Sequence, residues 1–162
     1  MNKIIEYLKT NDLTISTMES CTGGFVSNSI TNIEGSSDVF KFGAVTYSNE
    51  YKIKLGVSKD TIDKYSVYNI EVAKEMAKAI SLYTKSNFGI GITGKINRED
   101  NKNLFGNDNE IFISIFDSDK DIFYCLTLTT KYKERSKNKE YIYNNLIDMF
   151  EEEILERNQY GI

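Results

Sequence analysis

The chain has 162 residues, 40% of them hydrophobic and 27% charged, and a formal net charge of −4 at pH 7. This composition is typical of a soluble globular protein, and the length suits a single domain over residues 1–162. The acidic balance without a basic stripe argues against a nucleic-acid binder, and no apolar run is long enough to span a membrane.

The predicted elements of the first half alternate between helix and strand. In chain order the pattern indicates a helix over 2–11, a strand over 13–17 that extends as far as Glu19, a helix over 23–33, a turn over 34–38, a strand over 39–48 and two short helices within 49–65. The strongest helix covers 69–85, with Asn69 suited to the N-cap. Its apolar residues recur at helical spacing: Val72, Met76, Ala79, Ile80 and Tyr83.

The second half begins with a short apolar run over 88–93, typical of a buried strand. Strands over 110–116 and 121–129 form a predicted hairpin, and a helix over 135–157 closes the pattern. This order predicts an α/β fold, a three-layer α/β/α sandwich with a mixed β-sheet. The polar segment 94–109 is long for a loop, so we expect a lid, a binding loop or a disordered insertion there.

Two residue counts restrict the chemistry. The chain contains no histidine, which excludes Ser-His-Asp triads, Cys-His pairs and histidine-containing zinc sites. Its two cysteines, Cys21 and Cys125, lie far apart, and the N-terminal segment lacks the apolar core of a signal peptide. We therefore expect free thiols and a cytoplasmic protein. Any nucleophile needs a lysine, a tyrosine, a carboxylate or a helix N-terminus to activate it.

The stretch "TMESCTGG" at 17–24 places several reactive groups at the junction between a predicted strand and a predicted helix. Ser20 and Thr22 suit helix capping, because a hydroxyl there accepts a hydrogen bond from an unpaired backbone N–H. The same junction suits catalysis, since such N–H groups stabilise an oxyanion, and Gly23 and Gly24 let a ligand approach the backbone. The residues alone leave both interpretations open.

The two neighbours of Ser20 are also ambiguous. Glu19 suits either a catalytic role or the orientation of Ser20 and its loop. Cys21 has no histidine partner, so we expect a structural thiol rather than a nucleophile.

The stretch "AVTYSNEYKIKLGV" at 44–57 offers a base. A free lysine titrates near about 10.4, so it serves as a base near neutral pH only when burial or a nearby charge lowers its pKa. Tyr47 ends a predicted strand and Lys52 follows five residues later, so the two can face each other across the turn. Most such pairs are surface residues, and the spacing alone does not identify a site.

The motifs "ESCTGG", "GSSDVFKFGAVTYSNEYKIKLGV", "EVAKEMAKAI" and "GITG" together resemble the CinA C-terminal domain family over residues 13 to 94, and more loosely to the end. Members with known activity are nicotinamide mononucleotide deamidases. The family's larger proteins add an N-terminal domain related to molybdopterin-binding folds, and this chain resembles the stand-alone form.

The resemblance implies a serine amidohydrolase. It places the nucleophile on Ser20, the tyrosine on Tyr47 and the general-base lysine on Lys52, with backbone N–H groups near the glycines holding the oxyanion. It implies a small nucleotide substrate, no metal, no organic cofactor, and a homo-oligomer, most simply a dimer. The implied substrate contacts are Glu19, Cys21, Thr22, Gly23, Gly24, Thr46, Asn49, Thr93, Gly94 and Arg135.

Three segments depart from the family pattern. Relatives usually read "TGIAGPGG" where this chain has "TGKINRED", and "GAVS" where it has "SVYN" at 66–69. Near the end, "TTKYKER" replaces "GDR" with a further arginine, leaving Arg135 as the best match and Lys131 as a substitute. We expect weak hydrolysis at best and a loop that is mobile or folded away from Ser20. The alternative is an inactive relative that serves as a nucleotide-binding or regulatory module.

Overall fold

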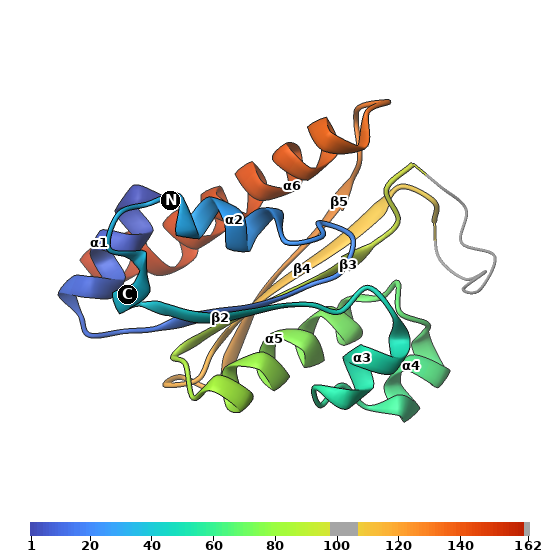
Figure 1. Ribbon diagram of the computed structural model, residues 1–162, viewed down its shortest axis with the longest axis horizontal. Helices are drawn as coiled ribbons and strands as arrows, with labels where there is room; N and C mark the ends of the chain where they lie inside the picture. Colours follow the sequence, from blue (N-terminus) through green and yellow to red (C-terminus); the bar gives the residue numbers. More distant parts are fainter. Residues whose placement is uncertain (98–106, 161–162) are drawn as a thin grey trace.

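The computed structural model describes residues 1–97 and 107–160. A five-stranded sheet of order β2-β1-β3-β4-β5 lies between two layers of helices (Figure 1). The strands are β1 (Ile15–Glu19), β2 (Phe40–Val45), β3 (Phe88–Gly94), β4 (Glu110–Asp117) and β5 (Ile122–Thr129). Because β1 pairs in parallel with β2 and β3, while β4 and β5 form an antiparallel hairpin beside β3, the predicted mixed sheet is confirmed.

Helices cover both faces of the sheet (Figure 1). One face carries α1 (Asn2–Thr10), α2 (Phe25–Thr31) and α6 (Arg135–Phe150), and the other carries α3 (Asn49–Lys54), α4 (Lys59–Tyr65) and α5 (Ile70–Thr84). A short 3-10 helix, η1 (Ser36–Asp38), fills the predicted turn before β2. The three-layer arrangement is as the pattern predicted. Among the described helices, none combines the length and the apolar composition of a membrane span.

The helix α5 lies unusually close to β3. Asn69 caps it as expected, its side chain accepting a hydrogen bond from the backbone N–H of Glu71 at 2.9 Å. On the facing strand, a Cβ at Gly89 or Gly91 would collide with carbonyl oxygens of α5. The glycines of the "FGIGIT" run therefore permit a helix–sheet distance that side chains would prevent.

Several predicted boundaries were wrong. The strand predicted over 39–48 is confined to Phe40–Val45, and the predicted last helix continues as a π-helix, η2 (Glu151–Glu156), and then α7 (Arg157–Tyr160). Tyr83, expected in the core, is 63% exposed and contacts the ring of Phe42 instead. Both rings lie at the surface, which the helical spacing of Tyr83 does not reveal.

The order β2-β1-β3 determines where a site can form. The three parallel strands end at the same edge of the sheet, and the connections from β1 and β2 leave in opposite directions. In such sheets ligands bind in the crevice outside the carboxyl ends, at the point where the strand order reverses. The segments after Glu19, Val45 and Gly94 meet at this edge.

Candidate active site

Ser20 directly follows β1 at this edge. Its backbone N–H donates to the carbonyl of Ile92 at 3.0 Å, and the residue is buried, 8% exposed. The helix predicted to start at residue 23 begins only at Phe25, because Gly23 and Gly24 adopt positive φ angles of 62° and 93° in a turn. Ser20 is therefore separated from the first turn of α2 by a left-handed turn that suits glycine.

Glu19 anchors this turn. Its fully buried carboxylate accepts hydrogen bonds from the backbone N–H groups of Val26 and Ser27, both at 2.9 Å, and from the hydroxyls of Thr22 and Ser27 at 2.8 and 2.7 Å. A carboxylate thus supplies the cap of α2, for which the sequence had offered the hydroxyls of Ser20 and Thr22 as one of two interpretations. Glu19 therefore orients the loop around Ser20, which is one of the two roles that the sequence left open. The hydroxyl of Thr22 contributes to the same hydrogen-bond network.

Lys52 reaches Ser20 from the other side of the crevice. It lies in α3, whose N-cap Ser48 accepts a hydrogen bond from the N–H of Tyr51. The lysine is only 1% exposed, and its Nζ lies 3.0 Å from Ser20 Oγ and 2.6 Å from the carbonyl oxygen of Thr46. The two residues to which the resemblance assigns the nucleophile and the base therefore lie in contact, and the Thr46 carbonyl fixes the direction of the amine.

Tyr47 points elsewhere. It is 67% exposed, and its hydroxyl lies 3.5 Å from Nη2 of Arg135 at the start of α6. The other guanidinium nitrogen of Arg135 donates to the carbonyl of Ile96. The spacing of Tyr47 and Lys52 suggested a hydrogen-bonded pair. Their side chains instead point in different directions, because α3 turns Lys52 inward while Tyr47 stays at the surface.

Burial raises the pKa of the Cys21 thiol to about 12. Loss of hydration is the largest cause, opposed by the positive charges of Lys52 and Arg135 and reinforced by the negative charge of Glu19. A thiol in this state is not a nucleophile near neutral pH. The expectation of a structural Cys21 agrees with this environment.

The remaining predicted substrate contacts have different environments. Thr46 is buried, and its hydroxyl has no hydrogen-bond partner among the described residues. Thr93 donates from its hydroxyl to the carbonyl of Val67 at 2.8 Å, and Gly94, with φ 155°, lies against β4 too closely for a side chain. Asn49 is the first residue of α3. Of these, only Thr46 offers a side-chain group that the fold has not used.

The loop after β3 begins differently from what its polar sequence indicated. Lys95 and Ile96 are buried, with Lys95 Nζ 3.5 Å from the carboxylate of Asp108 and 4.8 Å from the ring centroid of Tyr68. The first part of the loop therefore packs on the protein. Arg98 and the rest of the segment to residue 106 lie outside the described residues.

One residue that the sequence analysis missed is Asn138. It is fully buried in α6, accepts from the N–H groups of Lys131 and Tyr132, and donates to the Tyr132 carbonyl and the side chain of Asn97. It thereby joins the start of α6 to the loop after β3 and fixes the turn beside Arg135. The sequence does not show that the side-chain oxygen and nitrogen of an asparagine within a helix both form hydrogen bonds.

No group of histidine, cysteine or carboxylate side chains that could hold a metal ion occurs in the parts of the chain that the structure describes.

The sequence of the chain matches those of known proteins. The model of the CinA C-terminal domain family matches residues 1–154. A competence-damage inducible protein of Caldanaerobacter subterraneus and a CinA-like protein of Kosmotoga olearia are each 46% identical over 92 residues, which is 56% of this chain and 22% of each relative. The match therefore spans about a fifth of the length of these relatives.

Solved structures agree with the fold. A competence or damage-inducible protein from Enterobacter asburiae superposes with a TM-score of 0.81 at 20% identity, and the protein CihA from Agrobacterium tumefaciens with 0.79 at 24%. Both comparisons cover 91% of this chain and 92% of the other. At these identities the likeness establishes the shared architecture.

Proposed function

On the premise that the chain belongs to the CinA C-terminal domain family, we propose that it is an amidohydrolase that converts nicotinamide mononucleotide to nicotinic acid mononucleotide and ammonia. The observation that carries the proposal is the 3.0 Å contact between Ser20 Oγ and the Nζ of the buried Lys52. A hydroxyl in contact with an amine is one of the arrangements that can activate an amide-cleaving serine in a chain without histidine.

In the proposed reaction Ser20 Oγ attacks the carboxamide carbon while the neutral amine of Lys52 accepts the hydroxyl proton. The Thr46 carbonyl keeps the amine directed at Ser20. The proton then passes to the departing nitrogen as the C–N bond breaks, which releases ammonia and leaves an ester on Ser20. Water cleaves the ester by the reverse proton path, giving the carboxylate product and the original serine.

The turn after Ser20 supplies the groups for the oxyanion. The N–H of Gly23 already donates to the carbonyl of Ser20 at 3.1 Å, so it is not available. The oxyanion role therefore falls to the N–H groups of Cys21, Thr22 or Gly24. The Glu19 carboxylate holds this turn in place, and preorganised donors of this kind stabilise charge that develops in the transition state.

Positive charge near the turn supports an anionic substrate. The Nζ of Lys139 lies 3.2 Å from the position that a Cβ on Gly23 would occupy, and no carboxylate among the described residues pairs with it. Arg135 lies on the same side, within electrostatic range of Cys21. A phosphate monoester bound beside the turn would meet both cations.

The alternative is a module that binds a nucleotide without cleaving it. It is favoured by Lys95 and Ile96, whose buried side chains occupy the start of a loop where relatives usually carry glycine-rich backbone. The two functions predict the same binding but different turnover.

The deciding experiment measures ammonia release from nicotinamide mononucleotide by the full chain. We expect release that is lost in Ser20→Ala and retained in Ser29→Ala, a matched control on α2 whose hydroxyl donates to the Phe25 carbonyl away from Lys52. Binding of the nucleotide without ammonia release would favour the alternative. Equal turnover in wild type and Ser20→Ala would refute the serine mechanism.

A further inference from the structure

The outer edge of β5 is open. Among the described residues β5 pairs only with β4, in an uninterrupted register from Ile122 to Thr129. Its sequence, "IFYCLTLT", contains no charge and no proline. Natural proteins usually protect such edges with charged side chains, prolines or bulges, because an unprotected edge pairs with another strand.

The opposite edge of the sheet shows these protections. The edge strand β2 carries the exposed Lys41, and its pairing with β1 shifts register between Ile15 and Thr17. Within one sheet, therefore, one edge is protected and the other is not.

The backbone groups that a partner would meet can be identified. The N–H of Thr130 donates to the carbonyl of Asn109, on the β4 side. Backbone groups of an antiparallel strand alternate in direction, so those of residues 123, 125, 127 and 129 point outward. The free edge therefore offers four consecutive outward-facing positions, centred on Leu126.

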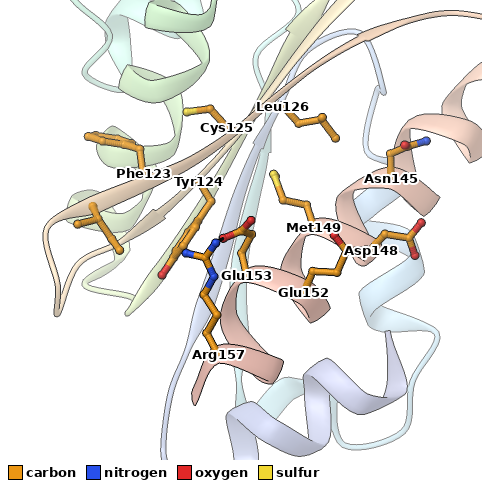
Figure 2. A pocket seen from close by; sticks show the side chains of 11 residues that line it. Phe123, Tyr124, Cys125, Leu126, Asn145, Asp148, Met149, Glu152, Glu153 and Arg157 are labelled. Atoms are coloured by element: carbon orange, nitrogen blue, oxygen red, sulfur yellow. Dashed lines mark ion pairs between the residues drawn. The ribbon is translucent and has the colours of Figure 1, made fainter. Parts of the chain in front are cut away.

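Beside this edge lies a groove of about 620 Å³ between β5 and the helical layer (Figure 2). Figure 2 shows Leu126 and Met149 facing each other across it, with Asp148 and Glu152 on the helical side. Phe123 lies on the other side of the sheet, near Lys74 of α5. The groove adjoins the open edge of β5 and reaches the helical layer. A partner strand that carries its own helix would therefore cover both the edge and the groove.

The charges along this layer are strongly polarised. Residues 131–140, at the start of α6, hold five basic and two acidic side chains, whereas residues 148–157 hold five acidic and one basic. This order opposes the helix dipole, which favours acidic residues at the N-terminus and basic residues at the C-terminus. A second helix lying antiparallel to α6 would place opposite charges together and compensate for this arrangement.

The strand shows the same polarity. Residues 117–121, at the end of β4 and in the hairpin turn, include Asp117, Asp119 and Asp121 with a single lysine, and residues 130–133, after β5, include Lys131 and Lys133 and no acidic residue. An antiparallel copy of β5 would bring the acidic turn of one chain beside the basic segment of the other. Sheet and helix layers thus have the same self-complementary charge pattern.

From this we infer that two copies of the chain associate through β5, antiparallel about a two-fold axis, forming a continuous ten-stranded sheet with α6 beside α6 of the second copy. Such an axis requires one residue to lie opposite its own copy, because directly opposed residues share a face. Centring the pair on Leu126 engages all four outward-facing positions, because residue 123 then lies opposite 129 of the second copy and residue 125 opposite 127. The groove and the open edge are then covered by the same partner.

The first test measures the mass of the full chain by sedimentation at low ionic strength. We expect twice the 18.6 kDa of one chain. Thr127→Pro removes an outward N–H that does not bond to β4, and it should yield a monomer with an unchanged circular dichroism spectrum. Thr127→Val, which keeps the N–H, is the matched control and should remain dimeric. A monomeric wild type, or a dimer that survives the proline, overturns the inference.

A second variant covers the case in which the proline prevents folding. Lys133→Glu should weaken association by placing like charges together at both ends of the interface, and adding Asp119→Lys should restore it. Unchanged association in the single variant would show that this edge is not the interface.

Cross-linking tests the register. Directly opposed, hydrogen-bonded residues have Cα atoms about 5.5 Å apart, within the range of a disulfide. In this register the exposed Cys125 lies opposite residue 127 of the second copy. Mild oxidation of Thr127→Cys should therefore give a covalent dimer, and adding Cys125→Ser should give none. A cross-link that forms equally fast in the wild type, where Cys125 has no cysteine opposite it, would indicate random collision and contradict the register.

Discussion

At Ser20, reactivity depends on groups brought from distant parts of the chain. Lys52 lies 32 positions away, yet its amine contacts the serine hydroxyl and the Thr46 carbonyl inside a buried crevice. A buried amine with two oxygen partners is restricted in direction, so its removal affects both reactivity and packing.

The first prediction concerns Lys52. If the chain is an amidohydrolase, Lys52→Met should abolish ammonia release, and Lys52→Arg should do the same, because a guanidinium does not act as a base at ordinary pH. The methionine keeps most of the packing but leaves the Thr46 carbonyl without its partner, so the free energy of unfolding should fall by about 1–3 kcal/mol. Urea unfolding measures this loss, and turnover in the arginine variant would show that another group takes the proton.

The second prediction compares the two thiols. Because the pKa of Cys21 is raised to about 12, its thiolate is scarce near neutral pH and should increase only as the pH approaches that value. Iodoacetamide at pH 8 should therefore modify the exposed Cys125 and leave Cys21 intact, as peptide mass spectrometry would show. Rapid modification of Cys21 in the folded chain would contradict the buried environment assigned to it.

The third prediction concerns Ser66, whose φ of 64° and ψ of 169° lie in a region that is almost restricted to glycine. Its buried hydroxyl also has no partner among the described residues. Ser66→Gly should raise the free energy of unfolding by about 1 kcal/mol, because relieved strain exceeds the entropy lost through glycine. Ser66→Ala keeps the strain and should give a smaller gain in thermal unfolding experiments.

At the scale of elements, the candidate site lies where the ends of three strands meet, and two buried side chains hold the neighbouring segments in place. Glu19 holds the turn before α2, and Asn138 holds the start of α6 against the loop after β3. These supports position Ser20 and Arg135 without contacting each other. The loop after β3 is one of the three segments that the sequence analysis found to depart from the family pattern.

The fourth prediction concerns that loop. Replacing residues 95–100 by "IAGPGG" should raise ammonia release if side chains at its start restrict substrate binding, because glycine lets backbone N–H groups approach a ligand. The effect should appear mainly in KM. Since Ile96 is buried, its replacement by alanine in this design should also lower stability by about 2–5 kcal/mol, measurable by urea unfolding. Unchanged kinetics in a folded variant would show that the loop does not limit activity.

At the scale of the whole molecule, the polarised charges predict a salt-dependent association. Screening lengths fall from about 10 Å at 0.1 M salt to about 3 Å at 1 M. Sedimentation should therefore show the dimer weakening as salt rises, while Lys133→Glu, which lacks the attraction, should show little change or the opposite trend. A dimer that strengthens with salt would indicate that apolar contact, rather than charge, holds the two copies together.

The sequence by itself determined the elements and the class of chemistry. Periodicity and turn residues predicted the order of helices and strands, because each depends on neighbours within a few positions. The absence of histidine restricted the activation of any nucleophile, and the motifs around Ser20 and Lys52 indicated the family and the two residues that the fold brings together.

Only the tertiary structure decided which groups share an environment. It placed Lys52 on Ser20 but turned Tyr47 to the surface, and it buried Lys95 although the local sequence is polar. It also exposed Tyr83, which helical spacing had assigned to the core. These outcomes depend on strand order and on which neighbours cover each face, and such contacts join residues that local sequence patterns cannot relate.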